Sequence, residues 1–146
     1  MLVQQLPIYN KTRMFARDFI FAYEKMRNLH KHRLGAFVYD RTLRLAWYLK
    51  KANRHVNDDA ARNGYIEDYL DELDTIANAL RLAFDCRIID VGTHSRLGDQ
   101  IAEMGKQATA WKNKRTSNRP GCPPSTDAGS EPTLQRAHDG RPQGTT

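Results

Sequence analysis

Apolar residues recur along the first 115 positions at alternating steps of three and four, which is the spacing of a helix buried along one side. The first such stripe predicts a helix over about residues 7–32. Pro7 suits its first turn, because the backbone N–H that proline lacks has no partner inside the helix there. The stripe consists of Ile8, Thr12, Phe15, Phe19, Ala22, Met26 and Leu29.

Three further stripes of the same kind predict three more helices. The second stripe consists of Val38, Thr42, Leu45, Leu49, Ala52 and Val56. The third consists of Ile66, Leu70, Leu73, Ala77, Leu80 and Phe84. The fourth consists of Leu97, Ile101, Met104, Ala108 and Trp111. The links between stripes are short and no alternation of period two competes, so we expect an all-α protein folded as an antiparallel up-down four-helix bundle.

The links between the stripes carry residues that begin and end helices. Gly35 lies close to the break between the first two helices. Asp58 and Asp59 can cap the third helix with side-chain oxygens, and their charge suits the positive end of its dipole. For the fourth helix, the expected N-cap is Thr93 or Ser95.

The composition changes at Ser117. The segment that begins there holds five of the six prolines and almost no large apolar side chains. Such a segment cannot bury enough surface to offset the entropy lost on ordering. We therefore expect a bundle domain over residues 1–116 and a disordered, proline-rich tail over residues 117–146.

Charge is distributed unevenly along the predicted helices. Residues 1–57 hold 12 Lys and Arg against 3 Asp and Glu, whereas residues 58–87 hold 3 against 8. The basic block favours a polyanionic partner such as RNA, although a single surface cation is more often simply solvated. Because both signs share one bundle, we also expect the acidic helix to neutralise part of the basic block. The candidate nucleic-acid-binding residues are Arg13, Arg17, Arg41, Arg44, Lys50, Lys51, Arg54, Lys106 and Lys112.

Aromatic and acidic residues form the candidate surface for protein contacts. Trp47 and Tyr48 are interleaved with cations on the second helix, a mixture that suits unstacked bases, but they can equally be core or subunit contacts. Residues 67–74 form an acidic run that we interpret as a patch for another subunit or a basic partner. The candidate interface residues are Trp47, Tyr48, Glu67, Asp71, Asp74 and Trp111.

No motif in the chain indicates an enzyme. It has neither a P-loop nor a dinucleotide-binding fingerprint, and we expect no catalytic residue and no cofactor. A metal site built from the acidic run is disfavoured, because no helix carries the Glu-x-x-His pair of carboxylate metal bundles. His30 and His32 lie on different sides of a helix without a cysteine at zinc spacing, so we expect no zinc either.

The remaining composition predicts a compartment. Cys86 and Cys122 lie in different kinds of segment, which favours two free thiols in a reducing compartment over the alternative of a disulfide. No stretch approaches the roughly 18–20 apolar residues of a membrane span. We therefore expect a cytoplasmic protein with no membrane partner.

Two stretches resemble a known family. Residues 6–12 (LPIYNKT) resemble the L-P-[IV]-Y-x-K-T opening of four-helix-bundle proteins related to those encoded in 23S rRNA intervening sequences. Residues 101–106 (IAEMGK), followed by Trp111, are similar to the ending of the accessory variability proteins (Avd) of diversity-generating retroelements. The middle of the chain also fits that branch at Gly35, residues 41–43 and residues 52–53.

The resemblance implies a non-enzymatic partner of a retroelement reverse transcriptase. Members of the family form a ring of bundles, a pentamer, with a basic surface. They bind the reverse transcriptase and the template-repeat RNA or an RNA/DNA hybrid, and they support mutagenic retrohoming. In that process a cDNA made with errors at adenines replaces a variable repeat in a target gene.

Three residues of the second motif carry structural expectations. Gly105 inside a helix costs about 1 kcal/mol relative to alanine, so its presence predicts a close approach to another helix or a packing need. Trp111 lies on the apolar stripe and is expected in the core or at a subunit interface. Lys106 projects away from that stripe and is expected to join the basic surface.

Two alternative functions remain open from the sequence. The first is a bundle protein that binds only other proteins and docks through its acidic third helix. The second is a carboxylate-metal enzyme in the bundle core, which ranks last because no ligand set is present.

Overall fold

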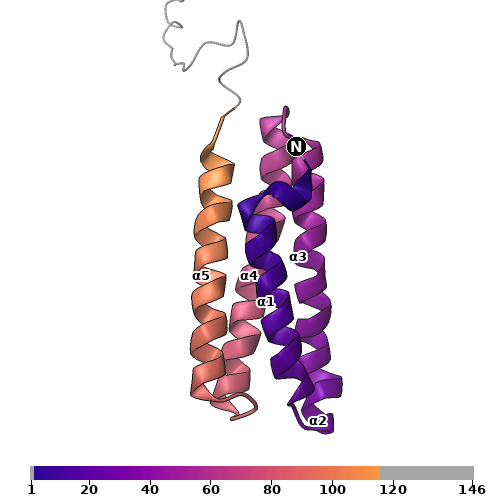
Figure 1. Ribbon diagram of the computed structural model, residues 1–146, viewed down its shortest axis with the longest axis vertical. Helices are drawn as coiled ribbons and strands as arrows, with labels where there is room; N and C mark the ends of the chain where they lie inside the picture. Colours follow the sequence, from indigo (N-terminus) through magenta and orange to yellow (C-terminus); the bar gives the residue numbers. More distant parts are fainter. Residues whose placement is uncertain (1, 116–146) are drawn as a thin grey trace, which may run out of the picture. The chain divides into compact units, whose positions relative to one another are not determined.

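A computed structural model of the protein describes residues 2–115, and every regular element in that range is a helix (Figure 1). The long helices are α1 (Pro7–Glu24), α3 (Ala36–Arg54), α4 (Asp59–Asp85) and α5 (Val91–Asn113). Short pieces complete the set: η1 (Val3–Gln5), α2 (Asn28–His30) and the π-helical η2 (Lys31–Gly35). The four predicted helices are thus confirmed. The predicted disordered tail over residues 117–146, and Cys122 within it, lie outside the described residues.

The four long helices lie side by side as a bundle (Figure 1). Helix α1 packs against α3 and α5, and α4 packs against the same two helices. The connection between α1 and α3 lies at the same end of the bundle as the connection between α4 and α5. The buried apolar residues of the four long helices pack into one shared core. The large fully buried side chains of that core include Phe15, Phe19, Leu45, Leu49, Ile66, Ile76, Leu97 and Met104.

The first helix ends earlier than the sequence predicts. Helix α1 stops at Glu24 rather than near residue 32, and Arg27 has an extended backbone before the next turn begins. Met26 is still buried, but Leu29 is 56% exposed. The apolar spacing in the sequence continues past the end of α1 because the chain reverses within a few residues. The short helix α2 then places Leu29 at the next expected step. The predicted boundary over residues 7–32 is therefore wrong by about two turns.

Gly35 allows the tight reversal between α1 and α3. A Cβ at this position would lie 2.9 Å from Met26 Sδ, 3.0 Å from Tyr23 Cδ1 and 3.1 Å from the carbonyl oxygen of His30. Those distances are shorter than ordinary van der Waals contacts, so the π-helical turn packs closely on the end of α1 only without a side chain here. The predicted break near Gly35 thus has a packing cause.

The N-caps of α4 and α5 are both aspartates. Asp58 accepts a hydrogen bond from the Ala61 amide at 3.2 Å, which confirms the predicted start of the third long helix. Asp90 caps α5 by accepting from the Thr93 amide at 2.7 Å. The predicted caps Thr93 and Ser95 are therefore wrong, because α5 begins one turn earlier, inside the segment assigned to the link.

The buried face of α4 is turned relative to the predicted stripe. Tyr69 and Ile76 are fully shielded from solvent, whereas Leu70 and Phe84 are only partly buried. Tyr69, Ile76 and Ala83 are buried in place of Leu70, Ala77 and Phe84, so each of these buried positions lies one residue earlier than predicted. The rotation of α4 about its axis is set by its packing between α3 and α5, which the spacing of apolar residues does not fix.

Helices α1 and α4 meet across the core through a polar contact. The Thr12 hydroxyl donates to the Ile8 carbonyl at 2.8 Å and lies 2.7 Å from the Tyr69 hydroxyl. Both hydroxyls are satisfied when Tyr69 donates a hydrogen bond to Thr12 and Thr12 donates its own to the Ile8 carbonyl. Burial raises the pKa of Tyr69 well above its usual range, so this phenol stays neutral.

Candidate nucleic-acid interface

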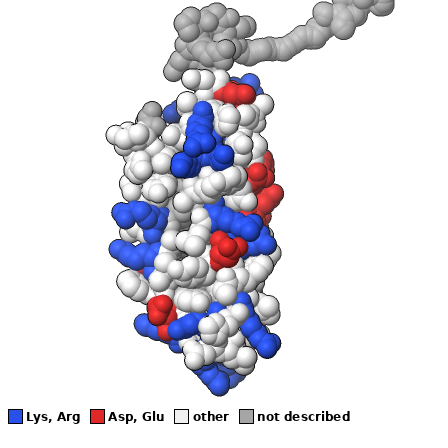
Figure 2. Space-filling view, turned by 90° about the vertical axis from the view of Figure 1, so that its right-hand side faces the viewer, with Lys and Arg blue, Asp and Glu red and all other residues white. Residues whose placement is uncertain are grey.

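The outward face of α3 carries a strip of cations, two exposed and one half-buried, around one exposed tryptophan. Trp47, Lys50, Lys51 and Arg54 follow one another at steps of three, one and three, which places them on neighbouring positions of the helix surface. Lys50, Lys51 and Arg54 have no ion pair with any described residue. We call these four residues the α3 strip. Figure 2, which views the side of the bundle where α3 lies in Figure 1, shows Lys and Arg at intervals along this face and fewer carboxylates.

Trp47 is not a core residue. Its side chain is 51% exposed, and it is held by neighbouring rings. Tyr48 lies edge-on to it at 5.3 Å between centroids, and Tyr65 of α4 lies edge-on at 6.4 Å. The Lys51 ammonium lies 5.1 Å from the centroid of the Trp47 ring. Trp47 therefore does not lie in the core of a single chain, and contact with an unstacked base or with another subunit remains open.

A shallow groove separates α1 from α3 beside the α3 strip. Its volume is about 170 Å³, and its walls include Arg13 from α1 and Leu43 and Ala46 from α3. Arg13 is exposed and has no ion pair within residues 2–115. Since Lys50 lies one helical turn beyond Ala46 on the same side of α3, the groove brings a cation of α1 to the edge of the α3 strip.

Other predicted cations are paired inside the protein. Arg41 forms an ion pair with Glu72 of α4 at 3.1 Å, and Lys112 forms one with Glu67 of the same helix at 2.5 Å. These pairs confirm that the acidic helix neutralises part of the positive charge. Arg17 and Arg44 each pair with an aspartate of their own helix, at 3.3 and 3.4 Å. Lys106 is exposed without an ion pair in the described chain.

The Arg41–Glu72 pair belongs to a small network between α3 and α4. Glu72 is only 5% exposed, although it sits within the acidic run that the sequence assigns to the surface. The Tyr48 hydroxyl donates to its second oxygen at 3.5 Å. Burial raises the pKa of Tyr48, and the nearby carboxylates of Glu72 and Asp68 add to the rise. Arg41 and Tyr48 therefore serve the packing of α3 on α4, and no periodic signal in the sequence distinguished Glu72 from its exposed neighbours.

The acidic run on α4 is only partly available to a partner. Glu67 and Glu72 are engaged by cations, as described above. Asp68, Asp71 and Asp74 are exposed, and their carboxylates form no ion pair with the described residues. The candidate protein-binding patch therefore reduces to these three aspartates.

The end of α5 is fastened to the beginning of α4 by an arginine that the sequence did not single out. Arg62 is 2% exposed, and it donates to the backbone carbonyls of Lys112, at 3.5 Å, and of Lys114. It also pairs with Asp59 at 3.5 Å. A cation on the last carbonyls of a helix complements the negative end of the helix dipole. No apolar periodicity signals a buried arginine, so only the packing of α5 on α4 reveals this contact.

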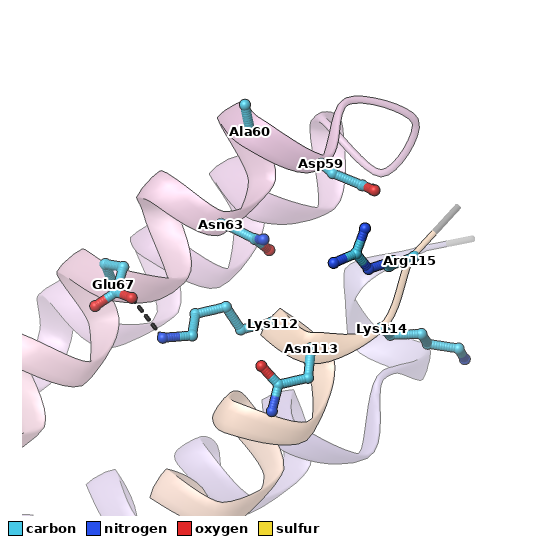
Figure 3. A pocket seen from close by; sticks show the side chains of 8 residues that line it. All are labelled: Asp59, Ala60, Asn63, Glu67, Lys112, Asn113, Lys114 and Arg115. Carbon is cyan, nitrogen blue, oxygen red and sulfur yellow. Dashed lines mark hydrogen bonds and ion pairs between the residues drawn. The ribbon is translucent and has the colours of Figure 1, made fainter. Parts of the chain in front are cut away.

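A polar pocket of about 480 Å³ lies beside this contact (Figure 3). Lys112 reaches across it to Glu67, whereas Lys114 points away from the pocket. Lys112, predicted to bind nucleic acid, is thus paired with a carboxylate of α4 at the surface of the bundle. Trp111, one residue earlier, is partly buried and packs against the core, as the apolar stripe predicts.

Gly105 does not mark a close approach between helices. A Cβ added at this position would meet no atom within 4 Å. The predicted packing reason for this glycine is therefore wrong within the single chain, because the side of α5 that carries it is not covered by another described helix.

A second group of cations lies where α1 turns into α3. Lys25, Arg27 and Arg33 are exposed there and have no ion pair with a described residue. Lys31 lies 5.7 Å from the centroid of the Tyr23 ring. These residues belong to the basic block of the sequence, but the candidate binding residues did not include them.

Comparison with known proteins found no match to a family model, to a curated protein or to a solved structure. In residues 2–115, no three His, Cys, Asp or Glu side chains are placed to hold a metal ion together. Among the described helices, none is both long and apolar enough to cross a membrane. Cys86 is a free, exposed thiol. The arrangement of charge on α1, α3 and α4 is therefore the main guide to function.

Proposed function

We propose that this protein is a non-enzymatic accessory protein of a diversity-generating retroelement. In this proposal it binds the reverse transcriptase and the template-repeat RNA, and it supports error-prone cDNA synthesis and mutagenic retrohoming. The two motifs at residues 6–12 and 101–111 support this assignment, because they lie on the first and last long helices in the order expected of the accessory variability family.

We infer that the four long helices form an antiparallel up-down bundle. Short connections and side-by-side packing of consecutive long helices support this topology. We also propose that copies of the chain assemble into a ring, the pentamer that the resemblance implies. The exposed aspartates of α4, Asp68, Asp71 and Asp74, form no ion pair with a described residue, so they are available to a basic surface of the next copy outside the α3 strip.

The observation that carries the RNA-binding part is the set of cations without internal partners. Arg13 lines the groove between α1 and α3, and the cations of the α3 strip have no ion pair with a described residue, whereas Arg41 and Lys112 are paired with carboxylates of α4. Cations left without a carboxylate attract phosphates and release the counterions that phosphates hold. The remaining positive surface is smaller than the sequence suggests, and part of it lies on the outer side of α3 and at its border with α1.

RNA binding by the full chain at several salt concentrations tests this part. With about four phosphate contacts, the logarithm of the binding constant is expected to fall with the logarithm of salt concentration at a slope near −3, from −0.7 per contact on a single strand. Replacing Lys50 and Arg54 by glutamine removes two contacts, so the slope is expected to become shallower by about 1.4.

A charge-matched variant controls for the loss of net charge. Lys11 lies on the other side of α1, beside Asp99 and Glu103, and Arg81 pairs with Asp85 on α4. The double variant Lys11→Gln/Arg81→Gln loses the same charge away from the α3 strip and is expected to keep the original slope. Binding that is absent, or that both double variants weaken equally, would count against a specific RNA surface.

The reverse-transcriptase part needs its own experiment. The chain is co-expressed with the reverse transcriptase encoded beside its gene, and the complex is isolated through a tag on the polymerase. Co-purification that survives nuclease treatment supports a direct protein contact. Absence of such a neighbouring gene, or of any complex, contradicts the retroelement assignment while leaving RNA binding untouched.

A protein-only adaptor is the second candidate, and the exposed aspartates of α4 favour it. Charge reversal at Asp71 and Asp74 is the appropriate test, because Glu67 is already engaged by Lys112. If the adaptor reading holds, Asp71→Lys/Asp74→Lys abolishes assembly with the protein partner, and RNA has no effect on that assembly. Unchanged assembly of this variant with the partner would contradict the adaptor hypothesis.

A further inference from the structure

We propose that Trp47 is a stacking platform for an unpaired base, and that the cations around it hold the flanking phosphates of a single-stranded nucleic acid. The inference rests on the proposed function and deepens it, since it names the form of nucleic acid that the basic surface takes. A double helix hides its base faces, so an aromatic platform has a use only on an unpaired strand.

The surroundings of Trp47 hold its ring in place at the surface. Tyr48 and Tyr65 contact it edge-on, with interplanar angles of 74° and 84°. His55 stacks on Tyr65 at 5.4 Å with an interplanar angle of 15°, which in turn supports Tyr65. A supported ring loses little freedom when a base stacks on it, so more of the stacking energy is available for binding.

The cations of the α3 strip are spaced to follow a strand. Trp47 and Arg54 are seven residues apart, about 10 Å along the helix axis at 1.5 Å per residue. That distance corresponds to roughly three nucleotides of a stacked strand at about 3.4 Å each. Lys50 lies between them on the side toward α1, where Arg13 borders the neighbouring groove together with Leu43 and Ala46. A strand that crosses the strip can therefore place one base on Trp47 and neighbouring phosphates on the cations.

Charge favours a nucleic acid over another protein as the occupant of this surface. The α3 strip combines an exposed ring with three cations that have no ion pair among the described residues. Cores of protein–protein interfaces are depleted of lysine, whereas single-strand binding surfaces combine positive charge with aromatic platforms. A second copy of the chain on this surface is the competing occupant, and the experiment below separates the two.

Trp47→Ala and Trp47→Phe in the full chain test the platform. Two ligands are titrated against each protein: an unstructured 12-nucleotide RNA and an abasic strand of the same length, which has the phosphates but no bases. Stacking contributes per base an amount equivalent to roughly 5-fold to 150-fold in affinity. We expect Trp47→Ala to bind the RNA about tenfold more weakly, Trp47→Phe to lose less, and all three proteins to bind the abasic strand equally.

Tryptophan fluorescence gives a second readout of the same contact. Base stacking is expected to quench the wild-type signal on RNA binding. In Trp47→Phe only Trp111 remains, and it is packed against the core, so the quench is expected to disappear while binding persists. Unchanged far-UV circular dichroism establishes that both variants are folded.

Three results would overturn the platform. One is equal RNA affinity of wild type and Trp47→Ala. Another is an equal loss for the RNA and the abasic strand, since a base would then not be involved. The third is a change in sedimentation of Trp47→Ala without a change in RNA affinity, which would assign the surface to a second copy of the chain. The first and third leave salt-dependent RNA binding intact and refute only the platform, whereas a wild-type protein that binds no RNA refutes the RNA-binding proposal as well.

Discussion

Replacing Gly105 by alanine should stabilise the bundle, and this prediction separates a packing role of the motif glycine from a role in assembly. Glycine inside a helix costs about 0.5–1 kcal/mol relative to alanine, mainly because it loses more backbone freedom on folding. A Cβ at Gly105 would meet no atom within 4 Å, so no steric penalty offsets the gain. The expected change in the free energy of unfolding for Gly105→Ala is therefore about +0.5 to +1 kcal/mol.

Gly35 supplies the matched contrast within the same chain. Its Cβ would lie 3.1 Å from a backbone carbonyl oxygen and 2.9 Å from the flexible side chain of Met26. Forcing an extra methyl group into such a site costs about 1–3 kcal/mol, which equals or exceeds the helical gain. Because Met26 can move and the backbone cannot, we expect Gly35→Ala to destabilise the protein by about 1 kcal/mol. Gly64→Ala, where a Cβ also meets nothing, should resemble Gly105→Ala.

Urea unfolding followed by far-UV circular dichroism measures these differences. All variants are compared at one protein concentration, because self-association would otherwise shift the apparent stability. A Gly105→Ala protein that is less stable than wild type would refute the geometric reasoning. If Gly105→Ala is more stable but no longer assembles with itself or with the polymerase, then the glycine serves a contact between molecules.

The other predictions concern the polar contacts between helices. Arg41→Met should lower the free energy of unfolding by about 2 kcal/mol, because it leaves the buried carboxylate of Glu72 without its ion pair; this value lies between those typical of exposed and of buried ion pairs. The double variant Arg41→Met/Glu72→Met should recover most of this loss in the same urea assay, and no recovery would contradict the reasoning. Tyr69→Phe should cost about 1 kcal/mol through its lost hydrogen bond to Thr12, and a neutral effect would show that the bond contributes nothing. The amide of Thr93 holds the pKa of Asp90 below its usual range, so its stabilising contribution is present above about pH 4 and is lost as pH falls through the lowered pKa. Unfolding measured from neutral to acid pH should therefore show the advantage of wild type over Asp90→Ala shrinking at the acid end, and a constant advantage would exclude this linkage.

Much of the helical content could be predicted because it follows from local spacing. Apolar side chains at steps of three and four require a helix if they are to share one buried face, and the Asp58 cap is readable from its oxygen and its place before a stripe. The end of α1 could not be read in this way. The spacing continues through Met26, and only the close contact of Gly35 with the preceding helix shows where the chain reverses.

The candidate site divides in the same way. The excess of cations in residues 1–57 is a property of the sequence and needed no structure. Which of them remain free depends on partners far along the chain, as with Arg41 and Glu72, which are 31 positions apart. The buried Arg62 shows the reverse case, since its role depends on carbonyls of α5 that no local pattern connects to α4.

The sequence by itself determined that the described chain is helical, where the apolar faces of α1, α3 and α5 lie and that the charge is unevenly distributed, because these follow from the order of residues along a helix. The tertiary structure alone decided which charged side chains form ion pairs between helices and which face solvent without one. Whether a cation meets a carboxylate depends on how neighbouring helices are rotated about their axes. That rotation pairs Arg41 with Glu72, leaves Trp47 half exposed among unpaired cations, and so confines the candidate surface to the outer side of α3 and its border with α1.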